Sequence, residues 1–247
     1  MKWSAESAMI QRLTHEPWVK LETGAELENW DQEDEIAYNQ ANRQAEKLLF
    51  FINAFDFVKS LGIGGDYYEF GCHRARTFRM ALTEARRHGL DGMRFFAFDS
   101  FEGLPEAQTE TGVPSYHRGA LSTSEDQFWQ LVRDHGIYVE NIRIIKGFYQ
   151  DRLTTALQKQ FVAEGAKIAI ACIDCDLYES AAPVFHFIEP LIHEGTVLYI
   201  DDYFAGHKGS PLTGPARAFH EFERESGFKF IQHLQVGWWG RSFIAYK

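Results

Sequence analysis

Residues 167–180 read KIAIACIDCDLYES, and this stretch decides the fold. After the leading lysine its residues are apolar up to Ile173, as expected of a short strand that is covered on both faces of a parallel sheet. Asp174 and Asp176 follow the strand directly. A helical segment then covers 177–193, where two prolines are expected to shorten or kink it. The stretch therefore predicts a strand that delivers acidic side chains to the start of a helix.

Strands and helices alternate in the same way from residue 66 onward. Seven short segments are expected to be strands: 67–70, 94–98, 141–145, 167–173, 196–200, 228–232 and 242–246. Helices are expected between them over 77–88, 124–135, 149–163, 177–193 and 216–226. This alternation is typical of β–α–β units and a mostly parallel sheet. Because no helix separates the last two strands, we predict an α/β fold with a seven-stranded sheet whose last strand is antiparallel.

A helical pattern also precedes the first strand. Apolar residues recur there at steps of four, three, four and three, on one face of a helix over 31–60: Ala41, Ala45, Leu48, Ile52 and Phe55. We therefore expect residues 1–60 to form a helical N-terminal extension or lid, and residues 61–247 to form the α/β domain. The helix covers either the sheet or a second subunit of a homo-oligomer, and both arrangements stay open.

Composition narrows the classes of function. The 247 residues include 25 Lys+Arg against 35 Asp+Glu, a formal charge of −10, whereas nucleic-acid binding needs clustered positive charge. No window approaches about 18 consecutive apolar residues, and the first residues lack a continuous apolar run, so neither a transmembrane helix nor a secretory signal is expected. The three cysteines favour a reducing compartment. We expect a cytoplasmic protein that binds neither nucleic acid nor membrane.

Cys172 and Cys175 form a CxxC motif at the end of the predicted strand 167–173. Positions i and i+3 of a strand face opposite sides of a sheet. Since no second CxxC or HxxxH completes a zinc site, we interpret both as ordinary core cysteines.

Candidate ligand-binding residues stand at the ends of the first two strands, because open α/β sheets bind ligands beyond the carboxyl ends of their strands. Glu69 and Gly71 end the first strand, and the glycine lets the backbone approach a ligand closely. Thr77 stands near the next helix, where a hydroxyl caps the helix or meets an anion. Asp99 and Ser100 end the second strand, where an acidic residue either holds a ribose diol or caps the next turn.

Carboxylates cluster after two later strands. Asp174 and Asp176 follow one strand, and Asp201 and Asp202 follow the next. If these strands are neighbours, about 4.8 Å apart, the carboxylates converge. Like charges that close raise one another's pKa unless a cation neutralises them, and hard oxygen ligands suit Mg²⁺ or a similar ion. Helix capping explains Asp176 as well, but it explains the adjacent pair at the second strand poorly.

These motifs resemble the macrocin O-methyltransferase family, class I S-adenosylmethionine-dependent enzymes of which many methylate sugar hydroxyls of natural products. The resemblance spans about residues 66–226 and rests on EFG (69–71), DSFEGLP (99–105), KGFY (146–149), DCDLYES (174–180) and DDY (201–203). It implies a Rossmann-like methyltransferase domain over 61–247, with S-adenosylmethionine and Mg²⁺ or another divalent cation as cofactors. It also implies a small-molecule acceptor, a sugar or a glycosylated compound.

The resemblance further implies roles for the matched positions. The cofactor would be held by Glu69 and Gly71 along its methionine part, Thr77 near its carboxylate, Asp99 at the ribose, Ser100 and Phe148 at the adenine, and Asp174 beside it. Mg²⁺ would be held by Asp174, Asp201 and Asp202. The glycine pair common after the first strand is Ala75-Arg76 here, which leaves less room at the methionine end.

The expected reaction is an in-line methyl transfer from a sulfonium to a hydroxyl, which depends on an aligned nucleophile. A metal would acidify the hydroxyl, and a nearby carboxylate would take its proton. We assign Asp174 as metal ligand and base. His207, in the loop after the last acidic pair, is the second catalytic candidate, and His73 is a weaker one.

Other functions stay open. A class I methyltransferase that needs no metal, or that methylates another oxygen or a nitrogen, is the nearest alternative. A catalytically silent protein that binds S-adenosylmethionine is another, although four retained acidic residues speak against it. A nicotinamide dehydrogenase is disfavoured because G-x-G-x-x-G is missing. The loops 101–123 and 204–214 are expected to shape the acceptor pocket.

Overall fold

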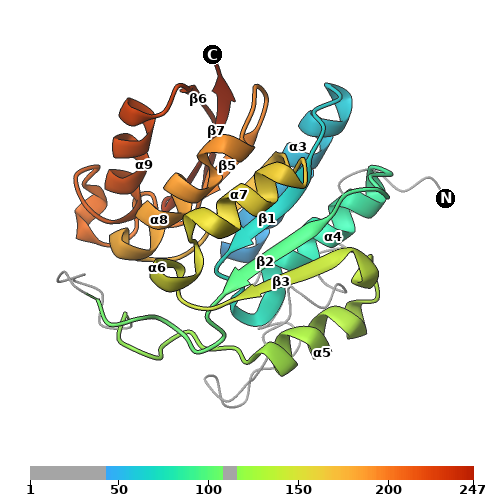
Figure 1. Cartoon of the computed structure of the whole chain (residues 1–247), viewed down its shortest axis with the longest axis horizontal. Helices are drawn as coiled ribbons and strands as arrows, with labels where there is room; N and C mark the ends of the chain where they lie inside the picture. The colour runs from blue at the N-terminus through green and yellow to red at the C-terminus, as the bar shows by residue number, and fades with distance from the viewer. Residues whose placement is uncertain (1–42, 108–115) are drawn as a thin grey trace.

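Seven strands form one sheet in the computed structural model, which describes residues 43–107 and 116–247. The strands are β1 (Asp66–Phe70), β2 (Phe95–Asp99), β3 (Ile142–Lys146), β4 (Ile168–Ile173), β5 (Val197–Ile200), β6 (Lys229–Val236) and β7 (Gly240–Tyr246). Their order across the sheet is β3-β2-β1-β4-β5-β7-β6, and Figure 1 shows β1 to β3 running side by side. β7 runs antiparallel to both of its neighbours, β5 and β6. The predicted α/β fold with an antiparallel last strand is confirmed.

The order of the strands reverses between β1 and β4. β1 pairs with β2 on one side and with β4 on the other, both in parallel. The chain leaves β1 toward β2, whereas β4 and β5 extend the sheet in the opposite direction. Such a reversal opens a crevice at the carboxyl ends of the strands, where these folds bind ligands.

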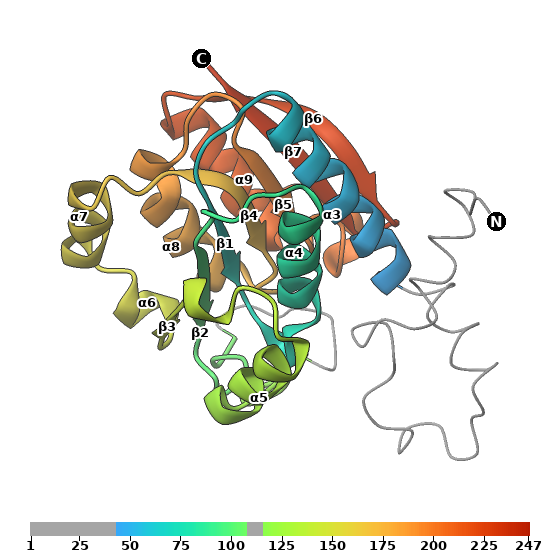
Figure 2. The same cartoon turned by 90° about the vertical axis from the view of Figure 1, so that its right-hand side faces the viewer.

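Helices cover both faces of the sheet. They are α3 (Arg43–Ser60), α4 (Arg76–Arg87), α5 (Glu125–His135), α6 (Tyr149–Arg152), α7 (Thr155–Ala163), α8 (Tyr178–Ile188) and α9 (Gly214–Glu225). In Figure 2, α3, α4 and α5 lie on one side of the sheet and α6 to α9 on the other. Two apolar clusters correspond to these two sides of a three-layer structure.

Two of the expected helices differ from the sequence pattern. The segment 149–163 is two helices, because Leu153 leaves helical geometry (φ −80°, ψ 59°) and the Thr154 hydroxyl accepts a hydrogen bond from the Leu157 amide. That bond makes Thr154 the N-cap of a new helix. The segment 177–193 is shorter than its pattern, since α8 ends at Ile188 and a 3-10 turn with Pro190 follows.

Helix α3 packs directly on the sheet. It is the described part of the helix expected over 31–60; residues 31–42 and the rest of the expected extension lie outside the described residues. Its side chains Phe51 and Phe55 are fully buried, and both rings lie near Tyr67 of β1. The helix ends where Gly62 adopts φ +66° and the Ile63 amide bonds back to the Val58 carbonyl, a common glycine-terminated helix end. The helix is thereby fixed against β1.

The three cysteines are free thiols and are buried. Cys172 lies in the apolar cluster on the α3 side of the sheet, whereas Cys175 lies in the cluster on the other side. This agrees with core cysteines and not with a joint zinc site. Among the described helices, none combines the length and the apolar character that crossing a membrane requires.

Candidate active site

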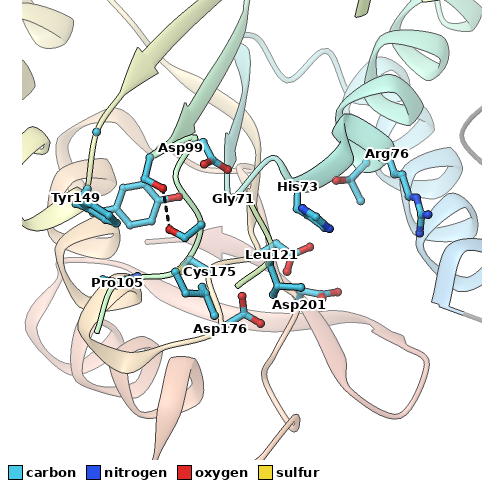
Figure 3. A pocket seen from close by; sticks show the side chains of 18 of the residues that line it. Gly71, His73, Arg76, Asp99, Pro105, Leu121, Tyr149, Cys175, Asp176 and Asp201 are labelled. Carbon is cyan, nitrogen blue, oxygen red and sulfur yellow. Dashed lines mark hydrogen bonds between the residues drawn. The ribbon is translucent and has the colours of Figure 1, made fainter. Parts of the chain in front are cut away.

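A cavity opens at the carboxyl ends of β1, β2 and β4. It comprises about 1060 Å³ of space between protein atoms, its open mouth included. Its lining residues are Gln44, Lys47, Gly71, His73, Arg76, Thr77, Asp99, Ser100, Gly103, Leu104, Pro105, Leu121, Gly147, Phe148, Tyr149, Gln150, Asp174, Cys175, Asp176, Ser180 and Asp201. Most of the residues proposed from the sequence therefore share one space, which Figure 3 shows from close by.

The floor of the cavity depends on a close approach of the segments that follow β1 and β4. The Asp174 amide bonds to the Phe70 carbonyl at 2.8 Å, and the Gly71 amide bonds to the Phe98 carbonyl at 3.0 Å. A Cβ atom at Gly71, whose φ is +93°, would lie only 1.7 Å from the backbone oxygen of Asp174. No side chain fits there, so the glycine is required by this backbone contact.

Asp99 is held by backbone amides at the end of β2. Its carboxylate accepts hydrogen bonds from the Cys72 amide and from the Phe101 amide, each at 2.6 Å. Burial raises the pKa of Asp99, whereas the two amides lower it. The residue thus caps the next turn, as one reading of the sequence had it. It also lines the cavity, and carboxylate oxygens can accept further hydrogen bonds there.

Glu69 lies beneath the cavity and not in its wall. Its side chain is fully buried and accepts hydrogen bonds from the Tyr67 hydroxyl and from the Thr77 hydroxyl, the latter at 2.9 Å. Burial raises the pKa of Glu69 to about 8, although these two hydrogen bonds lower it. Thr77 does not cap its helix; its hydroxyl connects the cavity wall to Glu69.

The turn after β1 differs from a glycine turn. Arg74 and Ala75 both adopt left-handed backbone angles (φ 58° and 48°), which cost energy in residues other than glycine. Arg76 begins α4 and lines the cavity beside His73, and both are labelled in Figure 3. The Thr123 hydroxyl lies 2.9 Å from Nδ1 of His73. Burial and the nearby Arg74 and Arg76 lower the pKa of His73 to about 4, so its ring is neutral near neutral pH.

Ser100 and Phe148 lie in the same wall as Asp99. The Ser100 hydroxyl donates a hydrogen bond to the Gly103 carbonyl at 2.8 Å and accepts one from the Glu102 amide at 3.1 Å. These bonds shape the start of the loop that follows β2. Phe148 precedes α6 at its N-cap position. Both positions were proposed for the adenine end, and the structure brings them to the same cavity.

Three carboxylates converge at the other end of the cavity. Asp174, Asp201 and Asp202 each offer an oxygen, and these oxygens lie within 4.8 Å of one another. We call these three residues the carboxylate cluster. Asp201 and Asp202 are almost completely buried, and the Tyr116 hydroxyl donates to Asp202 at 3.2 Å. Because β4 and β5 are neighbours, the two strand ends meet as expected.

A lysine from α3 enters the carboxylate cluster. The Lys47 ammonium lies 2.9 Å from Oδ2 of Asp174 and 3.0 Å from Oδ2 of Asp201, and the residue is only 6% exposed. Burial opposes its charge, but the two carboxylates outweigh burial and raise the pKa of Lys47. Burial and Asp201 raise the pKa of Asp174 despite Lys47. One ammonium does not neutralise three neighbouring carboxylates.

Asp176 is not the helix cap that the sequence allowed. The N-cap position of α8 is Leu177, and Asp176 adopts a left-handed backbone angle (φ 60°). That turn directs its carboxylate into the cavity, where Figure 3 shows it at the same end as Asp201. Burial and Asp174 raise its pKa. Asp176 is therefore a further acidic group in the lining of the cavity.

Lys47 and Gln44 are the site residues that the sequence analysis missed. They stand one turn apart on α3 and both line the cavity. The spacing along the helix could have revealed Lys47. It stands four residues before Phe51 and eleven before Val58, which places it on the same helix face as these two buried residues. A lysine within the buried stripe of a helix requires a partner. The side chain of His207 lies outside the described residues, and this candidate base stays a prediction.

The arrangement can bind a ligand that spans two chemically different ends. Asp99 offers hydrogen-bond acceptors at one end, and Asp174, Asp176 and Asp201 offer a group of acidic side chains at the other. The two ends lie apart in Figure 3. This suits a transfer reaction in which a donor and an acceptor meet inside one cavity.

Comparison with known proteins identifies the relatives of this chain. The profile of the macrocin-O-methyltransferase (TylF) family matches residues 19–235. One similar protein is the 8-demethyl-8-(2,3-dimethoxy-alpha-L-rhamnosyl)-tetracenomycin-C 4'-O-methyltransferase of Streptomyces olivaceus. It is 27% identical over 148 residues, which cover 58% of this chain and 54% of that protein. Demethyldecarbamoylnovobiocin O-methyltransferase of Streptomyces niveus is 26% identical over 148 residues, 57% of this chain and 53% of that protein. The chain thus matches about half the length of these relatives.

Solved structures share the fold. The O-methyltransferase NovP superposes with a TM-score of 0.70 at 19% identity, covering 96% of each chain. The calicheamicin methyltransferase CalS11 superposes with a TM-score of 0.68 at 17% identity, covering 99% of this chain and 94% of that one. At these identities the similarity supports the Rossmann-like methyltransferase fold.

The buried Glu69 predicts a pH-dependent stability. Its carboxyl titrates near pH 4.5 in the unfolded chain and near pH 8 in the folded one, so the folded state holds an extra proton between these values. The stability that this proton contributes is complete below pH 4.5 and is lost as the pH rises through about 8. Glu69→Gln removes this dependence. The free energy of unfolding of Glu69→Gln relative to wild type should rise by on the order of 2–5 kcal/mol from about pH 5 to about pH 8.5.

Urea unfolding at both pH values measures this difference. Glu164→Gln is the control, because Glu164 is exposed and its pKa is lowered, chiefly by Gln160 and then by Arg143, so no such gain is expected. A Glu69→Gln difference that is the same at both pH values would contradict the assignment.

Proposed function

Because the chain belongs to the macrocin O-methyltransferase family, we propose that it is an S-adenosylmethionine-dependent O-methyltransferase. One observation carries the proposal: a single cavity reaches from Asp99 to Asp174 and Asp201. A donor can therefore lie at the first end while its methyl group points to the acidic end. A silent binding protein would not need acidic side chains buried at that second end.

The proposed cofactor site is the Asp99 end. The Asp99 carboxylate accepts hydrogen bonds from the two ribose hydroxyls. Two backbone amides already position its oxygens, and these oxygens can accept further hydrogen bonds. Ser100 and Phe148 contact the adenine. Gly71, Thr77 and the underlying Glu69 accommodate the methionine part, and the Ala75-Arg76 turn narrows this end. Asp174 then lies next to the sulfonium.

The proposed acceptor is a hydroxyl of a sugar or of a glycosylated natural product. The names of the two bacterial relatives, one a rhamnosyl-tetracenomycin methyltransferase, support this class. The acidic end of the cavity favours an acceptor that is polar, uncharged or cationic over a polyanion. The acceptor hydroxyl would enter beside Asp174 and Asp176.

The carboxylate cluster is the proposed metal site. Asp174, Asp201 and Asp202 present hard oxygen ligands within 4.8 Å of one another, and this donor set fits Mg²⁺ or another divalent cation. Such an ion, when bound, supplies positive charge that favours the ionised form of a nearby hydroxyl.

In the proposed reaction the acceptor oxygen forms a bond to the methyl carbon while the carbon–sulfur bond breaks and its electron pair stays on sulfur. The hydroxyl proton passes to a carboxylate at the acidic end of the cavity. Asp174 is the proposed base, and His207 is the alternative. Asp176 faces the same space and orients the hydroxyl.

A second candidate is methyl transfer without a metal. Lys47 favours it, because an ammonium already lies 2.9 Å and 3.0 Å from two of the three carboxylates. A fixed ammonium can supply part of the positive charge that the metal-dependent reaction takes from the ion.

Substitutions at the two ends of the cavity are expected to have opposite effects on cofactor binding and on methyl transfer. Asp99→Ala should weaken the binding of S-adenosylhomocysteine by about 10- to 100-fold, the loss expected for hydrogen bonds to a charged group. Asp174→Asn should bind it within about threefold of wild type but lose methyl transfer. Calorimetry gives the affinity, and formation of S-adenosylhomocysteine in a screen of glycosylated acceptors gives turnover. Wild-type turnover by Asp174→Asn would refute its catalytic role.

Chelation separates the two candidate mechanisms. If a divalent ion is required, EDTA should abolish methyl transfer and excess Mg²⁺ should restore it, while the affinity for S-adenosylhomocysteine stays the same. Turnover that persists in EDTA would instead favour the reaction that uses Lys47 alone.

A further inference from the structure

We propose that Lys47 is the resident cation of the carboxylate cluster and that it weakens the binding of a divalent ion there. The ion enters only as the Lys47 ammonium withdraws. This inference rests on the metal role proposed above for Asp174, Asp201 and Asp202, and it assigns to helix α3 a part in setting the metal affinity of the site.

The ammonium and an ion would use the same oxygens. Nζ of Lys47 contacts Oδ2 of Asp174 and Oδ2 of Asp201. The other oxygen of Asp201 already accepts hydrogen bonds from the Tyr199 hydroxyl and, at 3.1 Å, from the Trp239 indole. Oδ2 is therefore the oxygen that Asp201 turns toward the cluster. An ion that binds Asp201 through this oxygen has to share it with the ammonium, which lies 3.0 Å away.

Charge makes this competition strong. A divalent cation bound to these oxygens would lie within a few ångströms of the ammonium, and like charges repel more strongly in a buried site than in water. Lys47 is only 6% exposed, and Asp201 and Asp202 are 1% and 2% exposed, so solvent screens little of the repulsion. Removing the ammonium removes this repulsion and leaves the oxygens of Asp174 and Asp201 open to an ion.

The side chain can withdraw while the helix stays in place. Phe50 and Phe51 fix α3 against the sheet, where Phe50 stacks on Tyr199 with ring centroids 4.5 Å apart. The ammonium stands at the end of a flexible four-carbon chain. Gln44, one turn earlier on α3, lines the same cavity and is a polar side chain on the same helix. Figure 2 shows α3 beside α4 on this side of the sheet.

Titration of the full-length chain with Mn²⁺, followed by the loss of the free-ion electron paramagnetic resonance signal, tests the inference. Lys47→Met should bind Mn²⁺ at least about tenfold more tightly than wild type. Lys59→Met is the matched control, because Lys59 is exposed on the same helix and lies about 18 Å farther along it at about 1.5 Å per residue. Its effect on Mn²⁺ affinity should be negligible, since that distance exceeds a Debye length of about 10 Å.

Two further variants keep the test decisive. Lys47→Gln removes the charge but keeps a polar side chain, so it should also tighten Mn²⁺ binding if Lys47→Met does not fold. Adding Asp202→Asn to either Lys47 variant should weaken the gained binding, which locates the ion in the cluster. Unchanged or weaker Mn²⁺ binding in the folded Lys47 variants would overturn the inference. Methyl transfer is not part of this readout, so a failed acceptor screen would leave the result interpretable.

Discussion

The ion pairs of Lys47 with Asp174 and Asp201 join three parts of the chain that are far apart in sequence. They connect α3 to the carboxyl ends of β4 and β5. Breaking a buried ion pair by removing one partner costs about 3–5 kcal/mol, because the other charge stays buried. Three ionised carboxylates so near the core are costly unless a cation is among them. The same constraint explains why this end of the cavity is suited to a cation at all.

The position of the site follows from the sheet. The order reverses between β1 and β4, and the segments that follow these two strands approach so closely at Gly71 and Asp174 that no side chain fits between them. Asp99 at the end of β2 and Asp201 just after β5 then stand on opposite sides of β1 and β4. A donor-binding end and an acidic end are thus separated by the width of the central strands, and one ligand pair can occupy both.

Much of this arrangement could be predicted from the sequence. Apolar runs of four to eight residues bounded by turns mark strands, and all seven appear at their expected places. Asp174, Asp201 and Asp202 could be brought together because parallel strands end at one edge. The split of one expected helix into two at Leu153 and Thr154 could not be predicted, since the apolar pattern continues across both α6 and α7. The turn at Asp176 was also missed, because an aspartate before a helix usually caps it.

Lys47 shows most clearly what could not be predicted from the sequence. Its contact with Asp174 joins residues 127 positions apart, and no local pattern encodes such a distance. Only the buried position of Lys47 on α3 indicates that a partner is needed. Its identity depends on how α3 packs on the sheet, which is a property of the whole fold.

A crystal structure of the complex with S-adenosylhomocysteine and Mn²⁺, with the ion located by its anomalous scattering, tests the account most directly. We expect the ribose on Asp99, the ion among Asp174, Asp201 and Asp202, and the Lys47 ammonium moved away from the Oδ2 atoms that it now contacts. A ligand bound outside this cavity, or an ion held elsewhere while Lys47 still bridges Asp174 and Asp201, would contradict the account.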